Sequence, residues 1–308
     1  MSERYKVQNR WLFHSNIKIK IPEKYDNKIF DELYSVLEEI NKKYNSYSIY
    51  SYITKINKNS GHFVEVDETT IEILETIKYY SEKLDGEYDI TIMPLIKLWG
   101  FYKDKQDRTP STDEIEKTKK LVNYKQIEIN RDKKVVKIAK GQEIITGSFI
   151  KSFAVEKLVE KMKEKGITRA IINAGGSTIR ALNDANQETW GVVVEDPNNI
   201  EKDLFDIEIS NETFSTSAQT NTYVEIKGKK YGHIISPKTG FPSENKQIGI
   251  ITKSGFIGDI ISTGLYNQTP KMFLKIINEL SKELEIEGFL MDKNDKIYYS
   301  KNFKGYIG

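Results

Sequence analysis

The sequence predicts an α+β fold in which a mostly antiparallel sheet is flanked by helices, and three observations lead to that class. Apolar residues recur at helical spacing in two long segments of the N-terminal half, 26–44 and 68–84. Short segments of strand composition follow one another between 178 and 252, separated by turn residues. No repeat, low-complexity tract or flexible linker divides the 308 residues, so we expect one unit over 1–308, with two lobes as the alternative.

The first half of the chain mixes helices with a few strands. Residues 11–21 alternate in polarity, which indicates one half-buried strand. The helix over 26–44 leads through a tyrosine-rich loop into a short helix near 51–57, and the helix over 68–84 stops at Asp85-Gly86. After Gly86 the pattern predicts an apolar segment over 88–101 that is broken at Pro94, and then a short helix over 113–122. Two strands over 126–130 and 134–139 follow, and a helix runs from Thr146-Gly147-Ser148 to about Gly166.

The second half is dominated by strands. Turn residues and alternating apolar residues predict strands over 170–173, 178–182, 190–195, 206–209, 213–217, 222–227, 231–235 and 247–252. We expect a helix to begin near Gly258, a second helix over about 269–281, and a terminal hairpin that pairs 286–291 with 296–300.

Composition excludes several classes of function. The net charge is only +2 and no basic stripe is present, so we expect no nucleic-acid partner. The chain has no cysteine and three histidines, which rules out disulfides, zinc–thiolate sites and a histidine-rich metal site. No secretory signal opens the sequence and no apolar run could span a membrane, so a cytoplasmic protein is expected, or an extracytoplasmic one if a leader precedes the sequence.

Asp259 and Thr263 are four residues apart in the segment that follows the strand 247–252. If a helix begins near Gly258, both side chains lie on the same face of its first turn. A carboxylate and a hydroxyl offer the hard oxygen atoms that Mg²⁺ prefers, and N–H groups at a helix start favour a phosphate. The alternative is that Asp259 only caps the helix, and the spacing leaves both interpretations open.

Five further positions could carry chemistry. His233 ends a strand just before a Pro-Gly turn, where it could act as an acid or base, although a surface or packed histidine is the alternative. Ser148 and Lys151 open a helix and could hold a phosphate, or be a capping serine and an exposed lysine. Asp89 and Thr91 precede an apolar segment, where a helix cap is the plainer interpretation.

Two other segments could contact a ligand. Tyr47 lies in a loop of several tyrosines and could stack on a flat ring, with ordinary packing as the alternative. Gly175-Gly176 follow a strand and would let the backbone approach a ligand closely, although a tight turn is more usual for such a pair.

The order of these motifs along the chain is more specific than any one of them. It resembles the ApbE family of FAD:protein FMN transferases over about residues 11–270. The succession runs from Asp89-Ile90-Thr91 with Leu98-Trp99-Gly100-Phe101, through Gly147-Ser148 with Lys151 and Asn173-Ala174-Gly175-Gly176, to His233-Ile234-Ile235-Ser236-Pro237-Lys238-Thr239-Gly240-Phe241-Pro242 and Asp259 with Thr263.

The resemblance implies an ApbE-like unit, T-fold-like and duplicated, that binds FAD and Mg²⁺. It implies transfer of FMN to a Thr or Ser hydroxyl of an acceptor protein carrying a flavinylation motif, with release of AMP. The alternatives are a relative that binds FAD without turnover and an FAD pyrophosphatase that yields FMN and AMP. By position, Asp259, Thr263 and the Ser148 carbonyl would hold the metal, and His233 would accept the proton of the attacking hydroxyl. Tyr47, Asp89, Ile90, Thr91, Lys151, Gly175, Gly176 and Thr239 would contact FAD.

The chain departs from the family pattern around these residues. The pattern carries Met-Gly-Thr where Phe13-His14-Ser15 stands, Asp where Ile145 and Ser177 stand, and glycine where Ser152 and Ala218 stand, and the arginine expected after Ala218 is missing. It also carries Asp and Arg where Ser236 and Lys238 stand. Since supporting residues orient the groups that touch a ligand, these departures bear on how the site works.

Overall fold

An eight-stranded sheet is the central element of the computed structural model, which describes residues 4–102, 108–219 and 222–308. The strands follow the order β1-β2-β6-β7-β10-β13-β14-β15, and each neighbouring pair is antiparallel. They are β1 (Tyr5–Leu12), β2 (Ser15–Pro22), β6 (Ala170–Ala174), β7 (Thr178–Leu182), β10 (Thr213–Ala218), β13 (Gln247–Thr252), β14 (Ile286–Met291) and β15 (Ile297–Tyr299). The predicted α+β class with a large antiparallel sheet is confirmed.

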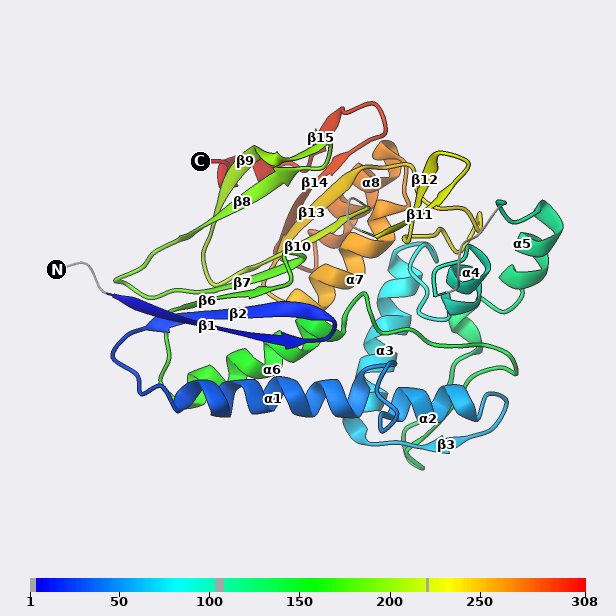
Figure 1. Ribbon diagram of the computed structural model, residues 1–308, viewed down its shortest axis with the longest axis horizontal. Helices are drawn as coiled ribbons and strands as arrows, with labels where there is room; N and C mark the ends of the chain where they lie inside the picture. Colours follow the sequence, from blue (N-terminus) through cyan, green and yellow to red (C-terminus); the bar gives the residue numbers. More distant parts are fainter. Residues whose placement is uncertain (1–3, 103–107, 220–221) are drawn as a thin grey trace.

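Helices cover one face of this sheet (Figure 1). They are α1 (Ile29–Tyr44), α6 (Ile150–Glu164), α7 (Gly255–Tyr266) and α8 (Pro270–Leu280). The face is set by alternation, since Ile17, Ile19 and Ile21 of β2 are buried in the core shared with α1, whereas Lys18 between them is exposed. In the described part of the chain, no helix has the length and apolarity needed to cross a membrane.

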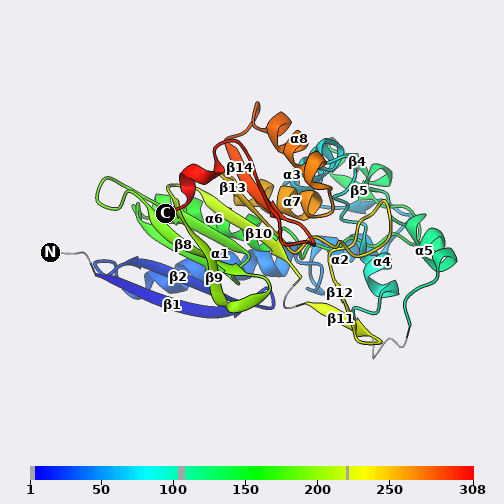
Figure 2. The same ribbon diagram turned by 90° about the horizontal axis from the view of Figure 1, so that it is seen from above.

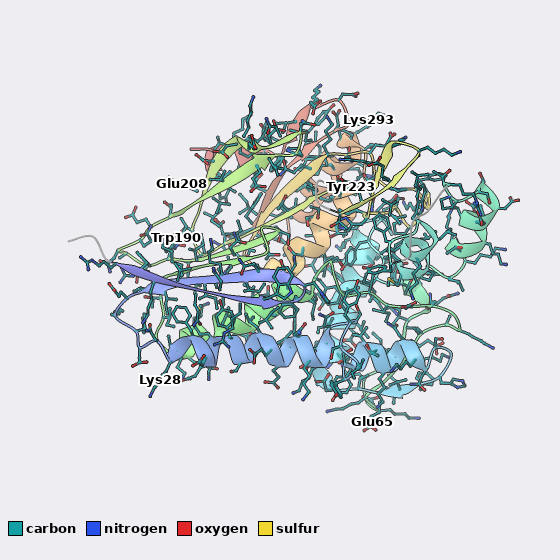
Figure 3. The ribbon with its side chains drawn as sticks, in the orientation of Figure 1. Lys28, Glu65, Trp190, Glu208, Tyr223 and Lys293 are labelled. Atoms are coloured by element: carbon teal, nitrogen blue, oxygen red, sulfur yellow. The ribbon has the colours of Figure 1, made fainter. Side chains whose placement is uncertain are left out.

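A two-stranded ribbon covers the other face of the sheet. It consists of β8 (Trp190–Asp196) and β9 (Asn199–Ile209), which lie above the sheet in Figure 1, whereas α6 lies below it. Figure 2 looks onto the sheet from the side of this ribbon. Val192, Ile207 and Phe214 form a second apolar core there. At the start of the ribbon, the Trp190 indole N–H donates to the Leu182 carbonyl at 3.0 Å, which ties β8 to the end of β7 (Figure 3).

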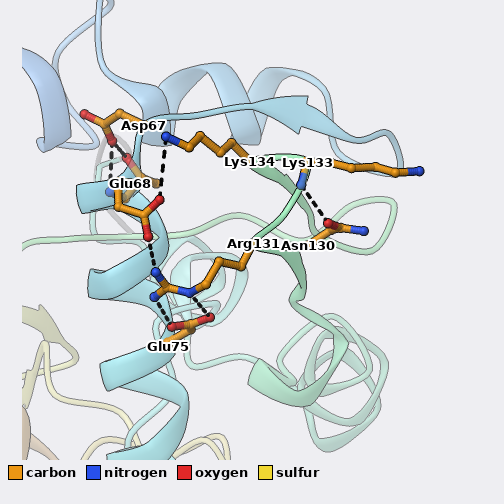
Figure 4. Close-up of polar contacts among 8 residues, drawn as sticks. Asp67, Glu68, Glu75, Asn130, Arg131, Lys133 and Lys134 are labelled. Atoms are coloured by element: carbon orange, nitrogen blue, oxygen red, sulfur yellow. Dashed lines mark hydrogen bonds and ion pairs between the residues drawn. The ribbon is translucent and has the colours of Figure 1, made fainter.

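The remaining elements lie beyond the ends of the central strands. They are α2 (Tyr52–Lys58), α3 (Glu68–Lys83), α4 (Met93–Leu98), α5 (Thr112–Lys119), the hairpin β11 (Tyr223–Ile226) with β12 (Lys229–Gly232), the small sheet of β3 (Val64–Glu65), β5 (Val135–Lys137) and β4 (Glu128–Asn130), and the 3₁₀ turns Tyr124–Gln126 and Phe303–Tyr306. Arg131, in the turn between β4 and β5, pairs with Glu68 and Glu75 of α3 (Figure 4). This fixes the small sheet against α3.

The structure differs from the sequence prediction mainly in strand boundaries. The single strand expected over 11–21 is a hairpin, because Phe13 and His14 turn the chain with φ of 53° and 56°. Polarity alternates on both sides of that turn, so the pattern alone does not reveal it. The strand expected over 206–209 begins at Asn199, and its extra residues are mostly exposed, so they lack an apolar signal.

Candidate functional site

A cavity of about 940 Å³ lies where the ends of β6, β7 and β10 meet the helices and the loops beyond them. Its wall includes Tyr47, Asp89, Ile90, Ser148, Lys151, Gly175, Gly176, His233, Asp259 and Thr263. The cavity continues below the ribbon, where Val192 and Val194 of β8 face Phe214 of β10. Its volume suits a large cofactor.

Asp259 lies in the second turn of α7 and does not cap it. The helix begins at Gly255, three residues before the expected start, and its N-cap is Ser254, whose Oγ accepts from the Ile257 N–H. The capping interpretation of Asp259 is therefore wrong, and the first-turn N–H groups lie away from it. Gly258 lets α7 approach the sheet, since a Cβ there would lie 2.7 Å from the Ser215 Oγ.

The Asp259 carboxylate is buried beside hydroxyl groups. The Thr178 hydroxyl donates to its two oxygens at 2.9 and 3.2 Å. Burial raises the pKa of Asp259 to about 6, against the opposing effects of the Ser215 hydroxyl and of the Lys151 charge. The Thr263 hydroxyl donates to the Asp259 carbonyl at 2.9 Å, and its oxygen lies one turn further along the cavity wall. The charge of Asp259 would be compensated by a bound cation.

Ser148 and Lys151 approach the cavity from the start of α6. Ser148 lies in the turn before this helix, where its Oγ is 2.9 Å from the hydroxyl of Tyr88. The Lys151 ammonium donates to the Ser177 hydroxyl at 2.6 Å. Burial lowers the pKa of Lys151, while the charge of Asp259 opposes that shift. Its partner is a neutral hydroxyl, so the ammonium can still compensate the charge of a phosphate.

The residues around Asp259 offer oxygen atoms of the kind Mg²⁺ binds. No three histidine or carboxylate side chains gather as a metal cluster anywhere in the ranges that the structure describes. Mg²⁺ needs no such cluster, because it is often held by one or two carboxylates and takes its other ligands from water and phosphate. One buried carboxylate, the Thr263 hydroxyl and the turn at Ser148 fit that ion and would not fit zinc.

His233 follows β12 and is fixed by one carbonyl group. Its Nδ1–H donates to the Thr222 carbonyl at 3.2 Å, and its backbone N–H donates to the same oxygen at 3.3 Å. This tautomer leaves the Nε2 lone pair available on the cavity side. Burial lowers the pKa of His233, and the nearby Lys151 charge lowers it further, so the imidazole is neutral at neutral pH and can accept a proton.

Tyr47 lies at the mouth of the cavity and presents a half-exposed ring. Its hydroxyl is hydrogen-bonded to that of Tyr102, and the edge of the His14 ring packs against it at 5.3 Å. The ring is therefore held in place while part of it stays accessible, which suits stacking on a flat heterocycle.

The segment at Asp89 is stabilised by its own side chains. Thr91 donates to Asp89 Oδ1 through its hydroxyl at 2.7 Å, and the Tyr124 N–H donates to Oδ2 at 2.8 Å. Asp89 does not cap α4, whose N-cap is Ile92. Its carboxylate holds the turn that places Ile90 on the cavity wall. Thr91 lies behind that wall, and Thr239 is exposed on the turn after His233, so neither lines the cavity.

Gly175 and Gly176 offer a matched test of close backbone packing. Both have positive φ, 71° and 75°, but only at Gly175 would a Cβ collide, 1.8 Å from the Ser15 Oγ. We expect Gly176→Ala to cost about 1 kcal/mol of unfolding free energy and Gly175→Ala clearly more. Urea unfolding measures both, and Ser15→Gly should relieve the larger loss. Equal costs for the two alanines would contradict the collision.

Many side chains on the cavity wall were not among the predicted site residues, and Glu87, Tyr88 and Tyr102 are examples. Tyr88 is the first residue of the apolar segment 88–101 and Tyr102 follows it, and no role at the site was predicted for either tyrosine from the sequence. Glu87 is 7% exposed, an unusual burial for a glutamate, and no periodic pattern marks it. Only the fold brings it near the loop after His233.

Known proteins share this arrangement of elements. A family model described as the ApbE family matches residues 13–287. The FAD:protein FMN transferase of Haemophilus influenzae is 22% identical over 249 residues, which span 78% of this chain and 72% of that protein.

Solved structures agree with the fold. The ApbE protein from Thermotoga maritima superposes with a TM-score of 0.89 at 23% identity, covering 98% of this chain and 99% of that one. The flavin transferase ApbE from Vibrio cholerae gives 0.85 at 20% identity, covering 99% of both chains. At such identities these two structures establish the fold alone.

Proposed function

The chain belongs to the ApbE family, and on that premise we propose that it transfers FMN from FAD to a Thr or Ser hydroxyl of an acceptor protein and releases AMP. The observation that carries the proposal is the cavity itself. It collects a buried carboxylate, a partly buried ammonium, a neutral imidazole and an accessible tyrosine ring from four separate parts of the chain. Those groups match the phosphates and the flavin ring of FAD, and the proton that the acceptor hydroxyl must lose.

Each group has a role that follows from its surroundings. Asp259 and Thr263, with the Ser148 carbonyl, would hold Mg²⁺, which when bound neutralises charge on the pyrophosphate. Lys151 supplies a second positive charge at the same phosphates. Tyr47 stacks on the flavin ring, and the glycines at 175 and 176 let the backbone approach the cofactor.

His233 is the base in this proposal. Its Nε2 takes the proton of the acceptor hydroxyl as that oxygen forms a bond to the phosphorus of the FMN moiety. The bond from that phosphorus to the oxygen of the AMP moiety breaks, and AMP leaves with the electron pair. The Thr222 carbonyl keeps Nδ1 protonated, so the imidazolium that forms remains hydrogen-bonded.

The proposal is tested by incubating the protein with FAD, Mg²⁺ and a protein that carries a Thr/Ser flavinylation motif. The expected result is AMP in solution and flavin fluorescence that stays with the acceptor after denaturation. Free FMN formed at the same rate without an acceptor would instead indicate a pyrophosphatase. Binding of FAD with no AMP under any of these conditions would contradict both activities.

Tyr47 should affect the affinity for FAD. We expect Tyr47→Ala to raise the Kd of FAD at least about fivefold, because a stacked aromatic pair contributes about 1 kcal/mol beyond the area that it buries. Tyr47→Phe keeps the ring and should bind FAD nearly as the wild type does. Quenching of flavin fluorescence on titration measures both constants, and equal affinities for the alanine variant and the wild type would exclude stacking on Tyr47.

A further inference from the structure

Glu87 makes a buried contact with the loop that follows His233. The carboxylate is 7% exposed and Ser236 is 5% exposed. The Ser236 hydroxyl donates to Glu87 Oε2 at 2.6 Å, a short hydrogen bond between two buried side chains. The two residues are 149 positions apart in sequence, so this bond joins two separate parts of the cavity wall.

Ser236 is the residue on which that loop is built. Its Oγ accepts from the Thr239 N–H at 3.1 Å, its carbonyl accepts from the Gly240 N–H at 2.8 Å, and its own N–H donates to the Phe241 carbonyl at 2.9 Å. Bonds within the loop fix its shape, but they do not fix where it sits. The bond to Glu87 joins it to the segment before α4, and the Trp99 indole N–H, which donates to the Gly240 carbonyl at 2.8 Å, joins it to the end of α4.

Two neighbouring contacts support the same junction. Asn267, at the end of α7, donates to the carbonyls of Glu87 and Ile235 at 3.3 and 3.4 Å. Lys238 pairs with Asp85, but both side chains are largely exposed, at 44% and 65%. Exposed ion pairs contribute little to stability, so the buried Glu87–Ser236 bond constrains the loop more strongly than the Lys238–Asp85 pair does.

We propose that Glu87 is a positioning residue for His233. Its carboxylate holds the loop 233–241 against the segment 85–89, and this places the imidazole where it meets the acceptor hydroxyl. The catalytic consequence rests on the proposed function, whereas the effect on the position of the imidazole does not.

The kinetic test compares Glu87→Ala, Glu87→Gln and the exposed control Asp85→Asn in AMP release. Loss of a group that orients a reacting side chain typically costs about 10- to 100-fold. We therefore expect Glu87→Ala to lower kcat at least tenfold while KM for FAD stays within about twofold. Glu87→Gln can still accept from Ser236, so its kcat should fall between those of Glu87→Ala and the wild type. Asp85→Asn should change kcat little.

Moving the carboxylate across the contact separates positioning from general damage. Ser236→Asp alone places two carboxylates side by side and should lower kcat. The double variant Glu87→Gln with Ser236→Asp restores a hydrogen bond at the junction, because the Gln amide can donate to the Asp carboxylate, and it should exceed Ser236→Asp alone. An unchanged kcat in Glu87→Ala, or a double variant no better than Ser236→Asp alone, would overturn the proposal.

A second readout needs no turnover. The chain has three histidines, so imidazole NMR signals can be assigned with His233→Gln. In Glu87→Ala the His233 signal should shift or broaden, and those of His14 and His62 should not. If the wild type releases no AMP, the proposed function fails but this spectrum still decides the role of Glu87. An unchanged His233 signal in Glu87→Ala would contradict the positioning role of Glu87.

Discussion

Replacing Asp259 by asparagine is expected to stop FMN transfer and, at the same time, to make the ligand-free protein more stable at neutral pH. The carboxylate is the one anionic group proposed to hold Mg²⁺, and metal charge stabilisation of several kcal/mol corresponds to a loss of about 10³-fold in rate. The stability gain has a separate cause, because the same carboxylate is buried without a full counter-charge.

The sign of the stability effect follows from the raised pKa. Burial raises the pKa of Asp259 from 3.8 to about 6, so between these pH values the folded protein holds a proton that the unfolded chain has lost. Stability therefore falls as pH rises through this window. Above it the ionised group costs about 3 kcal/mol, since each unit of pKa is worth about 1.4 kcal/mol. Asparagine has no such cost.

Urea unfolding at pH 5 and pH 8, with and without Mg²⁺, measures this prediction. The free energy of unfolding of Asp259→Asn should exceed that of the wild type, and the difference should be largest at pH 8 without metal. Mg²⁺ should stabilise the wild type but not the variant. Thr263→Val is the matched control, because it removes a neutral ligand and no buried charge. A variant that is less stable at pH 8, or that responds to Mg²⁺ as the wild type does, would contradict the role of Asp259.

The sequence predicted the fold class because its main elements carry strong periodic signals. Apolar spacing located α1 and α3 within a few residues. Boundaries failed where the signal is not hydrophobic, as at Phe13 and His14, which turn the chain in a left-handed conformation without glycine. The start of α7 was missed for a similar reason, since Ser254 caps the helix ahead of a run that contains little but apolar residues and glycine.

The site was predictable as a set of motifs but not as an arrangement. A comparison of positions treats Ser236 as the loss of an aspartate, whereas the fold brings the Glu87 carboxylate to the Ser236 hydroxyl. Likewise Lys151 contacts Ser177 where the family pattern carries an acid. Such compensation joins residues distant in sequence, and one sequence contains no signal for it. Thr91 and Thr239 show the converse, since a residue can belong to a motif without lining the cavity.

His233→Gln is expected to lower the rate of FMN transfer by about 10²- to 10⁴-fold, the contribution of a positioned general base, while FAD affinity is retained. Glutamine is similar in size and can still donate to the Thr222 carbonyl, so the loop should keep its shape. His62→Gln, an exposed histidine outside the cavity wall, is the matched control and should leave the rate unchanged.

The pH profile distinguishes a base from a residue that only packs. Burial and the charge of Lys151 lower the pKa of His233 below its ordinary 6.5, so the imidazole stays neutral, and able to take a proton, into mildly acidic solution. As pH falls through that lowered pKa, the wild-type rate should fall because the imidazolium has no free lone pair. Single-turnover transfer measured from pH 5 to 8 should show this fall in rate toward acidic pH in the wild type and in His62→Gln. The assay is run at saturating Mg²⁺, which keeps Asp259 ionised although burial raises the pKa of its free carboxyl to about 6. Under that condition, the same fall in rate in His233→Gln would show that another group titrates and that His233 is not the base.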